Sequence, residues 1–257
     1  MRFGARAVLA AAALTLVGIP FGLLLLLVKG EWRPLLDVDN GASNDLHHYA
    51  VSNRWFVLAM EALSTVGYTS SWLLISAVVV GWLAWRRLPR LAVFVTVTVL
   101  VSLLVNSVVK IVVNRARPVL PDPVAHSEGL SFPSGHAQAA MVGYAVLLLV
   151  FLPALSHAWR YAAIAGAAVM VVAIGFSRVA LGVHYVSDVL GGYVLGAAWV
   201  AAMTAAFNVW RVERGKPAAR PAEGLEPEYA GRIAVHEPAE RDPGSAPARV
   251  TAHHQDR

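Results

Sequence analysis

The chain has 257 residues, of which 57% are hydrophobic and 14% charged, with a mean hydropathy of +0.58. A soluble domain usually carries about 25% charged residues, so this composition excludes an ordinary soluble protein. Apolar runs of roughly 20 residues recur and indicate a polytopic membrane protein. The absence of cysteine excludes disulfides, thiol catalysis and cysteine-ligated metal sites. The net charge of +5 would suggest nucleic-acid binding in a soluble protein, so its distribution along the chain matters.

Six apolar segments are candidates for membrane-spanning helices. The first could be a signal peptide, but it exceeds the usual apolar length of about 7–15 residues, and no cleavage site follows it. We therefore expect a retained helix. The predicted spans are Ala7–Val28, Ser64–Trp85, Leu91–Val109, His136–Leu155, Tyr161–Phe176 and Tyr185–Trp210. The predicted fold class is an all-α polytopic membrane protein with about six transmembrane helices.

Two further segments complete the layout. Residues Asn44–Met60 are less apolar and predict a loop helix on the outer face that leads into the second span. Within it, His47 lacks a partner at a meaningful spacing and is expected at the surface. Residues 211–257 are rich in proline, alanine and charge and lack apolar periodicity, which predicts disorder. The expected organisation is a six-helix membrane domain over 1–210 and a disordered cytoplasmic tail over 211–257.

The charges in the short loops predict the orientation of the helices. One side holds six basic residues before the tail and no acid: Arg2, Arg6, Arg86, Arg87, Arg90 and Arg160. The other side holds seven basic residues and all eight acids of residues 1–210. Because cytoplasmic loops are enriched in Lys and Arg, both termini are predicted to be cytoplasmic. The tail holds eight charges of each sign, so the excess of +5 reflects the membrane domain and does not indicate a nucleic-acid partner.

Lys110 and Arg117 lie in the first of three polar segments predicted at the outer surface. Lys110 follows about 28 Å of helix from Leu91 at 1.5 Å per residue, which is roughly one bilayer core. Pro118 ends the helix after Arg117. These cations could extend to lipid headgroups, or they could form a binding site. The chain has 18 Arg and three Lys, so a lysine at this position favours a specific role.

The second segment, Ser131–His136, precedes the fourth span directly. Its Pro, Ser and Gly residues predict a turn that opens a helix. The free amides of that first turn, beginning near Ser134, can bind an anion. Gly135 lets a ligand approach the backbone closely, and His136 would face the same outer surface. The alternative is an ordinary capped helix with a surface histidine.

The third segment, Ser177–Asp188, pairs a histidine with a carboxylate. His184 and Asp188 are four residues apart and share one face if the stretch is helical. Asp188 can accept the N–H of one imidazole nitrogen, which leaves the other as a free base or nucleophile. Arg178 supplies a further cation. The alternative is a structural ion pair at the mouth of a helix.

Together the three segments describe a site for a phosphoryl group. Phosphoryl transfer depends mainly on positioning and on neutralising the charge of the equatorial oxygens. Two histidines can divide the nucleophile and acid–base roles. The residues that would take part are His184, His136, Asp188, Lys110, Arg117, Ser134, Gly135 and Arg178.

The pattern Lys-x6-Arg-Pro, Pro-Ser-Gly-His and Ser-Arg-x5-His-x3-Asp resembles the type 2 phosphatidic acid phosphatase superfamily, with all three motifs in order. The resemblance implies that His184 is a nucleophile forming a phosphohistidine, with Asp188 orienting it. It implies that His136 is the general acid and then the base. It further implies a phosphate cradle of Lys110, Arg117, Ser134, Gly135 and Arg178, and chemistry without a metal or cofactor. Soluble vanadium haloperoxidases share the motifs, but the membrane spans argue against that branch.

The resemblance also implies a substrate class. Similar members dephosphorylate undecaprenyl pyrophosphate, phosphatidylglycerol phosphate or phosphatidic acid. The Ala-, Val- and Arg-rich composition favours a bacterial cell-membrane enzyme with undecaprenyl pyrophosphate as the first expectation. The lipid would reach an extracytoplasmic site sideways from the bilayer.

Three other functions remain open at this point. A metalloenzyme could use His136, His184 and Asp188, with His126 or Glu128 as further ligands. A serine hydrolase could use Ser134 as its nucleophile, although no nucleophile-elbow sequence surrounds it. A lipid-binding or transport protein could keep the same fold without catalysis.

Overall fold

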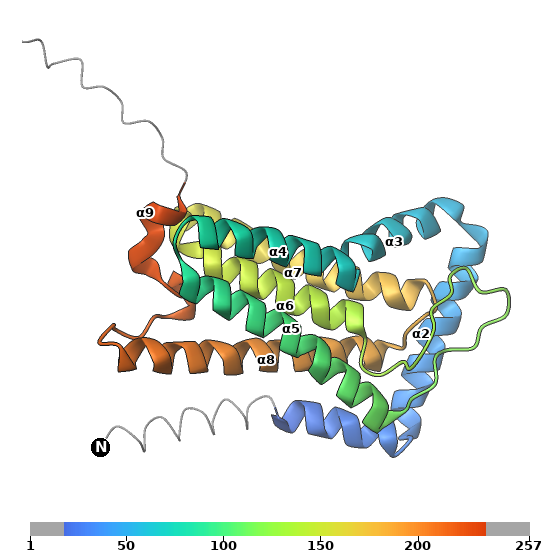
Figure 1. The fold of residues 1–257 in the computed structure, drawn as a ribbon. Coiled ribbons are helices and arrows are strands. Elements are labelled where there is room, and N and C mark those ends of the chain that lie inside the picture. The colour runs from blue at the N-terminus through green and yellow to red at the C-terminus, as the bar shows by residue number, and fades with distance from the viewer. Residues whose placement is uncertain (1–17, 235–257) are drawn as a thin grey trace, which may run out of the picture.

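The computed structural model describes residues 18–234, which form helices, turns and loops without a strand. Helices α4 to α8 lie side by side in one bundle, while α2 crosses one end of it and α9 lies at the other (Figure 1). We call these the α2–α3 end and the tail end. The main helices are Gly18–Lys29, α2 (Arg33–Ser52), α3 (Arg54–Val66), α4 (Thr69–Trp85), α5 (Pro89–Val113), α6 (Gly135–Phe151), α7 (His157–Ala180), α8 (Val186–Glu213) and α9 (Ala230–Ile233).

The all-α membrane fold class is confirmed by four helices that are long and apolar enough to cross a bilayer. They are α5, α6 with its 3-10 extension Leu152–Ala154, α7, and α8. The 25 residues of α5 extend about 37 Å at 1.5 Å per residue, which exceeds a bilayer core of about 30 Å. The apolar helix Gly18–Lys29 is the described part of the predicted first span, whose earlier residues lie outside the described range. The count of six spans stays a prediction.

The segment predicted as one loop helix over Asn44–Met60 is instead divided between two helices. The backbone leaves the helical region at Asn53 (φ −131°, ψ 83°), so α2 ends at Ser52 and α3 begins at Arg54. The Asn53 side chain donates to the Tyr49 carbonyl at 2.9 Å, which completes the end of α2. Helix α3 then meets α4 at a 41° bend, and the two helices are long and apolar enough to cross a membrane only when taken together.

Helix α2 also begins earlier than predicted, at Arg33, and it is not a free surface helix. Its buried residues Asp39, Ser43, His47 and Ala50 recur every three or four positions and therefore share one face. The expectation that His47 is a surface residue is wrong, because its side chain is buried and its Nε2 lies 2.6 Å from the Pro121 carbonyl.

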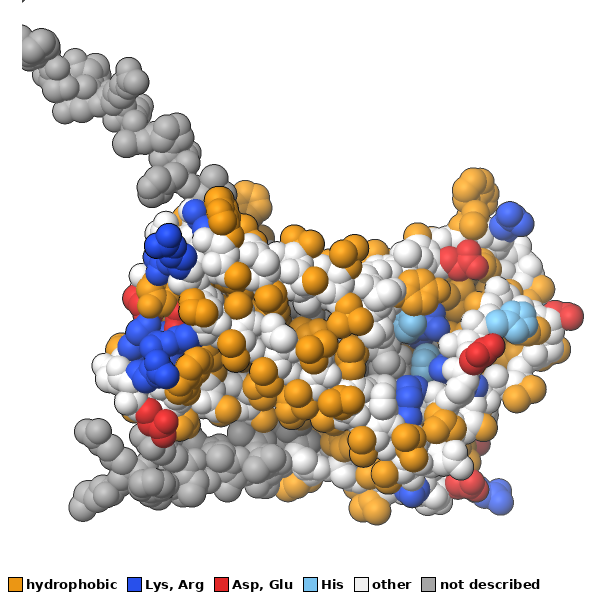
Figure 2. Space-filling model, viewed as in Figure 1, with side chains coloured by type: hydrophobic (Ala, Val, Ile, Leu, Met, Phe, Trp, Pro, Cys, Tyr) orange, Lys and Arg blue, Asp and Glu red, His pale blue; other side chains and the backbone are white. Residues whose placement is uncertain are grey.

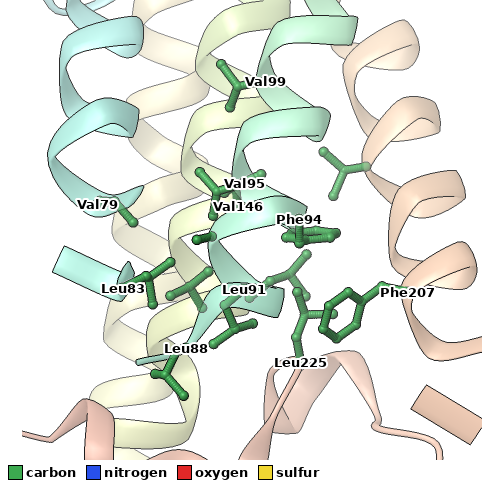
Figure 3. Packing of buried hydrophobic residues seen from close by; sticks show 14 of the residues in the cluster. Val79, Leu83, Leu88, Leu91, Phe94, Val95, Val99, Val146, Phe207 and Leu225 are labelled. Atoms are coloured by element: carbon green, nitrogen blue, oxygen red, sulfur yellow. The ribbon is translucent and has the colours of Figure 1, made fainter. Parts of the chain in front are cut away.

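Helix α6 forms the centre of the bundle and contacts α4, α5, α7 and α8. The largest apolar cluster lies toward the tail end, where Leu83, Leu91 and Phe94 of two helices meet Val146 of α6 and Phe207 of α8 (Figure 3). Burial of each such side chain contributes about 1.5–3 kcal/mol relative to exposure in water. This packing at the tail end fixes how far each helix extends along the bundle, and it thereby positions the helix ends at the α2–α3 end.

Two glycines allow α8 to approach α6 closely, as the Gly-x3-Gly spacing in the sixth predicted span indicates. A Cβ atom on Gly192 would lie 2.6 Å from the Ser134 carbonyl oxygen. A Cβ on Gly196 would lie 3.0 Å from the Met141 Cβ. The two glycines therefore serve close packing between two helices of one chain.

The predicted disorder of the tail is wrong for residues 211–234. Helix α8 continues to Glu213, and the chain then folds back over the tail end in two 3-10 turns, Pro221–Glu223 and Pro227–Tyr229, before α9. The Leu225 side chain is buried in the apolar cluster, and its N–H donates to the Leu149 carbonyl. Ile233 of α9 is buried in the same cluster, so two separate apolar side chains anchor the segment without creating a periodic pattern. Residues 235–257 lie outside the described range.

Charged side chains gather at the two ends of the bundle, and the face between them is mainly apolar (Figure 2). At the tail end, Arg211 is buried and forms two bonds of 3.0 and 3.1 Å with Glu228. Lys216 adds a 2.9 Å ion pair with the same carboxylate. These bonds lower the pKa of Glu228 to about 2, although partial burial opposes the shift.

Candidate active site

The three polar segments converge at the α2–α3 end of the bundle, where histidine and basic side chains are visible together (Figure 2). Helix α5 ends near Lys110, α6 begins at Gly135, α7 ends after Arg178, and α8 begins at Val186. Because neighbouring helices run antiparallel, the ends of α5 and α7 and the starts of α6 and α8 all lie at the α2–α3 end. The Ser134 N–H donates to the Asp188 carbonyl at 2.9 Å and joins the second segment to the third.

His184 and Asp188 form a buried pair between α7 and α8. The side chains are 2% and 0% exposed, and His184 Nδ1 lies 3.4 Å from Asp188 Oδ2. The same oxygen accepts from the Ser131 hydroxyl at 2.5 Å and from the Tyr185 N–H at 2.9 Å. The latter bond also caps the start of α8. Asp188 Oδ2 is therefore held in place by Ser131 and Tyr185 while it faces His184.

The partner of the other imidazole nitrogen defines the tautomer of His184. Arg117 Nη1 lies 3.1 Å from His184 Nε2. A guanidinium only donates, so Nε2 must carry the lone pair, and the N–H is on Nδ1, facing Asp188. Nε2 is the nitrogen with nucleophilic character.

Burial, together with the charges of Arg117 and Arg178, lowers the pKa of His184 to about 4, although Asp188 opposes the shift. The imidazole is therefore neutral at neutral pH. A neutral imidazole is the form required of a nucleophile, and it needs no other base to activate it.

Two of the predicted cradle cations are held by backbone carbonyls of the loop before α6. Lys110 Nζ donates to the Leu130 carbonyl at 2.5 Å. Arg117 donates to the carbonyls of Glu128 and Gly129 at 3.0 Å each and to that of Val183 at 2.7 Å. Burial lowers the pKa of Arg117, although Asp188 opposes the shift. These contacts fix both cations at the loop before α6 and hold Arg117 beside His184.

The start of α6 places three predicted residues together. Ser134 is the N-cap, and its hydroxyl accepts from the Ala137 N–H at 3.5 Å. Gly135 and His136 follow in the first turn, where backbone N–H groups point out of the helix. The His136 ring lies 5.0 Å from the Tyr68 ring, and its Nε2 has no hydrogen-bond partner among residues 18–234. That nitrogen is free to exchange a proton with a ligand.

Arg178 completes the set from the last turn of α7. Its Nη1 donates to the Ser64 hydroxyl on α3, and its Nε is unpaired within the described part of the chain. A buried guanidinium with an unused N–H is suited to bind an anion. All eight predicted residues therefore lie at one end of one bundle.

The comparison with known proteins assigns the family. Residues 91–211 match the PAP2 superfamily. Over 156 residues the chain is 40% identical to phosphatidylglycerophosphatase B of Bacillus subtilis, which covers 57% of this chain and 72% of that protein. The chain belongs to the PAP2 superfamily. The recognition from sequence is confirmed, and so is the enzyme class, a metal-independent phosphatase.

Other PAP2 relatives carry different names. The chain is 28% identical over 150 residues to an undecaprenyl-diphosphatase of Sulfolobus acidocaldarius, covering 55% of this chain and 65% of that protein. It is 34% identical over 117 residues to a lipid A 1-phosphatase of Rhizobium johnstonii, covering 42% and 44%. The crystal structure of a transmembrane PAP2-type phosphatidylglycerolphosphate phosphatase from Bacillus subtilis matches with a TM-score of 0.64 and 26% identity, covering 72% of this chain and 92% of that one.

Sequence reasoning about this PAP2 protein missed residues that contact Asp188 and Arg178. Arg115 donates to Asp188 Oδ1 at 2.7 Å and to Asp39 Oδ2 at 2.8 Å. Ser131 lies in the turn of the second segment, and no local pattern around Ser64 indicates a contact with Arg178. One signal was available for Arg115, since it lies two residues before Arg117 in a chain segment already rich in cations. No local pattern indicates Asp39, which is 76 residues away.

The geometry bears on two of the other functions. Among residues 18–234, no three His, Asp or Glu side chains come together as a metal-ligand group, so the proposed ligands of a metalloenzyme are not assembled there. The Ser134 hydroxyl is used as a helix cap, and the imidazole of His184 faces Ser131 and Arg117 instead. The arrangement of the PAP2 motifs thus favours the histidine as nucleophile over the serine.

Proposed function

We propose that the protein hydrolyses the phosphate ester or anhydride of a membrane lipid through a phosphohistidine on His184. The observation that carries this proposal is the contact of Arg117 with His184 Nε2, opposite the carboxylate of Asp188. It leaves a neutral, oriented nucleophile beside a cation that can bind the phosphate under attack.

The reaction proceeds in two balanced steps. His184 Nε2 attacks phosphorus, the bond from phosphorus to the leaving oxygen breaks, and His136 gives that oxygen its proton. A water molecule then attacks the phosphorus of the phosphohistidine, His136 takes its proton, the P–N bond breaks to return the electron pair to His184 Nε2, and inorganic phosphate leaves. Asp188 accepts the Nδ1–H throughout and stabilises the positive charge that the imidazole acquires.

The cradle neutralises the three non-bridging oxygens. Lys110 and Arg117 now donate to neutral carbonyls of the loop at residues 128–130. A phosphate oxygen is a stronger acceptor, because charge-assisted hydrogen bonds are roughly twice as strong as neutral ones. Arg178 contributes its unpaired Nε, and the first turn of α6 contributes backbone N–H groups at Gly135.

We propose phosphatidylglycerol phosphate as the first substrate to test and undecaprenyl pyrophosphate as the second. The relative with 40% identity and the matching crystal structure are both named for phosphatidylglycerol phosphate, while the undecaprenyl-diphosphatase is a more distant relative. This order departs from the expectation based on composition, which favoured undecaprenyl pyrophosphate. The site would face the extracytoplasmic side of the cell membrane, and the lipid would arrive from the bilayer.

Phosphate release from purified protein in detergent tests the proposal. We expect turnover of at least one of phosphatidylglycerol phosphate, undecaprenyl pyrophosphate and phosphatidic acid in the presence of EDTA. His184→Ala should reduce kcat by about 1000-fold or more, because the nucleophile is lost. His48→Ala, which truncates an exposed histidine on α2, is the matched control and should retain full activity.

Three different results would each contradict the proposal. Full activity of His184→Ala would exclude the phosphohistidine route. Loss of activity with EDTA that is restored by a divalent metal would favour the metalloenzyme instead. Binding of a lipid phosphate by the unaltered protein without release of phosphate would support the non-catalytic alternative.

A further inference from the structure

We propose that Asp39 and Arg115 are positioning residues that orient Asp188 and keep its negative charge available to His184. The inference rests on the proposed function, since it concerns the same nucleophile. Asp39 lies outside the three motifs, and Arg115 occupies one of the six unspecified positions of the first. The proposal gives helix α2 a role in the reaction, although α2 lies outside the residues 91–211 that match the PAP2 superfamily.

A series of contacts runs from Asp39 through Arg115 to Asp188 and His184. The contact between Arg115 and Asp188 lies in the middle of this series. Arg115 Nη1 lies 2.7 Å from Asp188 Oδ1, while Oδ2 of the same carboxylate faces His184. The guanidinium also lies 4.2 Å from the centroid of the Tyr185 ring. Arg115 therefore binds one oxygen of the Asp188 carboxylate, and the other oxygen contacts His184, the proposed nucleophile.

Asp39 holds Arg115 and α8 together. Its Oδ2 accepts from Arg115 Nη2 at 2.8 Å and from the Ser187 hydroxyl at 2.5 Å. Its Oδ1 accepts from the Ser187 backbone N–H at 2.9 Å. Ser187 directly precedes Asp188, so Asp39 fixes both the cation and the backbone beside the acid. Asp39 is 0% exposed, and a carboxylate buried this deeply is costly unless all its bonds are made.

The charges of Asp39, Arg115 and Asp188 explain why the site contains two acids. Without Asp39, the positive charge of Arg115 would offset the negative charge of Asp188 and weaken the effect of Asp188 on the His184 imidazole. The negative charge of Asp39 offsets the positive charge of Arg115. Asp39, Arg115 and Asp188, which we call the triad, therefore carry one net negative charge beside His184. Burial alone would lower the pKa of Arg115, but Asp188 and Asp39 together raise it, and the guanidinium stays charged.

The surroundings of His184 determine the sign of a pH test. The charged or titratable groups that face it are Asp188 from α8, Arg117 from the loop before α6, Arg178 from α7 and His136 from α6. Removing a negative charge from the triad lowers the pKa of His184, and removing a positive charge raises it. Because His184 must be neutral to attack, the acid limb of the pH profile follows this pKa.

The first experiment compares Asp39→Asn with Asp37→Asn in the purified protein, using the best lipid substrate of the phosphate-release panel. Asp37 lies on the same helix and is exposed, so its variant makes the same charge change away from the site. We expect Asp39→Asn to lower kcat about 10- to 100-fold, as for other groups that orient a functional histidine through a partner. KM should change less than about twofold, because Asp39 does not touch the substrate. Asp37→Asn should match the unaltered protein.

The second experiment follows the acid limb of kcat/KM. Asp39→Asn should move it to lower pH and Arg115→Gln to higher pH, and the double variant should restore it to near its original position. Arg115→Lys keeps the charge and should leave the limb unmoved while lowering kcat. If Asp39→Asn does not fold, as judged by thermal unfolding in detergent, the two Arg115 variants carry the same comparison.

Each outcome has one interpretation. Opposite shifts with a fall in kcat support the proposal. Unchanged kcat in Asp39→Asn, or a fall in kcat with acid limbs that stay in place or move together, would overturn it, because a purely structural contact predicts no opposite shifts. Absence of turnover by the unaltered protein would refute the proposed function, which is a separate failure.

Discussion

At the scale of single residues, burial of His184 dominates the chemistry of the site. The side chain is 2% exposed, and its surroundings contain more positive than negative charge. Burial and the neighbouring cations both favour the neutral imidazole, while Asp188 opposes them without reversing the shift. The proposed nucleophile is therefore neutral at neutral pH, and positive charge suited to a phosphate lies beside it.

The protonation of His184 can be measured directly. We expect it to titrate near pH 4, so that the imidazole is neutral above that pH and gains a proton as pH falls through it. Histidine ¹⁵N chemical shifts in labelled protein report this, and His184→Gln identifies the signal by its loss. A titration near the ordinary value of about 6.5 would contradict the burial argument.

The residues of the site differ in how far sequence could identify them. Lys110, His136 and His184 were predictable because fixed spacings place them at helix ends, which is a local property. Asp39 and Arg115 were not, because their roles depend on a contact across 76 residues. Asp39 looked like one of eight acids on the outer side, and only its burial distinguishes it.

At the scale of elements, the distance between α6 and α8 controls the site. Gly192 of α8 packs against the Ser134 carbonyl at the very start of α6. The His184–Asp188 segment begins α8, and Ser134–His136 begins α6. The two halves of the site therefore depend on how closely these helices approach.

Gly192→Ala tests this dependence. The added Cβ would lie 2.6 Å from the Ser134 oxygen, so α8 must shift, which typically costs about 1–3 kcal/mol of stability and should also lower kcat. Gly166→Ala on α7 is the matched control, because no atom lies within 4 Å of its new Cβ. Removing a helix glycine there should be neutral or stabilising by up to about 1 kcal/mol. Thermal unfolding and phosphate release measure both variants, and equal behaviour of the two would contradict the close-packing argument.

Elements also differ in how well sequence predicted them. The apolar runs predicted α5 to α8 because burial in lipid demands continuous hydrophobicity. The same criterion underestimated α7, whose ends at His157 and Ala180 extend beyond the apolar run. It also missed the folding of residues 214–234, because Leu225 and the ion pairs of Arg211 are single contacts with no repeat.

At the scale of the whole molecule, the two charged ends predict how the bundle lies in the membrane. The tail end carries Arg86, Arg90 and Arg211 of α8, and the α2–α3 end carries the candidate site. Loops rich in Lys and Arg stay on the cytoplasmic side, so the site is expected to face outward.

Cysteine labelling tests this orientation in a chain that has no cysteine of its own. Val119 is 95% exposed in the loop at the site, and Ser156 is exposed before α7 at the opposite end. In right-side-out spheroplasts, a membrane-impermeant maleimide should label Val119→Cys but not Ser156→Cys. After permeabilisation both should be labelled, and the reverse pattern would contradict the predicted orientation.

The sequence by itself determined the fold class, the family and the three segments that meet at the candidate site. These depend on hydrophobicity over about 20 residues and on spacings within a few turns of helix, which are local quantities. Only the tertiary structure decided how Asp188 is held, that α2 reaches the site through Asp39, and that the chain after α8 folds back on the bundle. Burial and pairing of charges depend on distances in space, which a linear pattern does not contain.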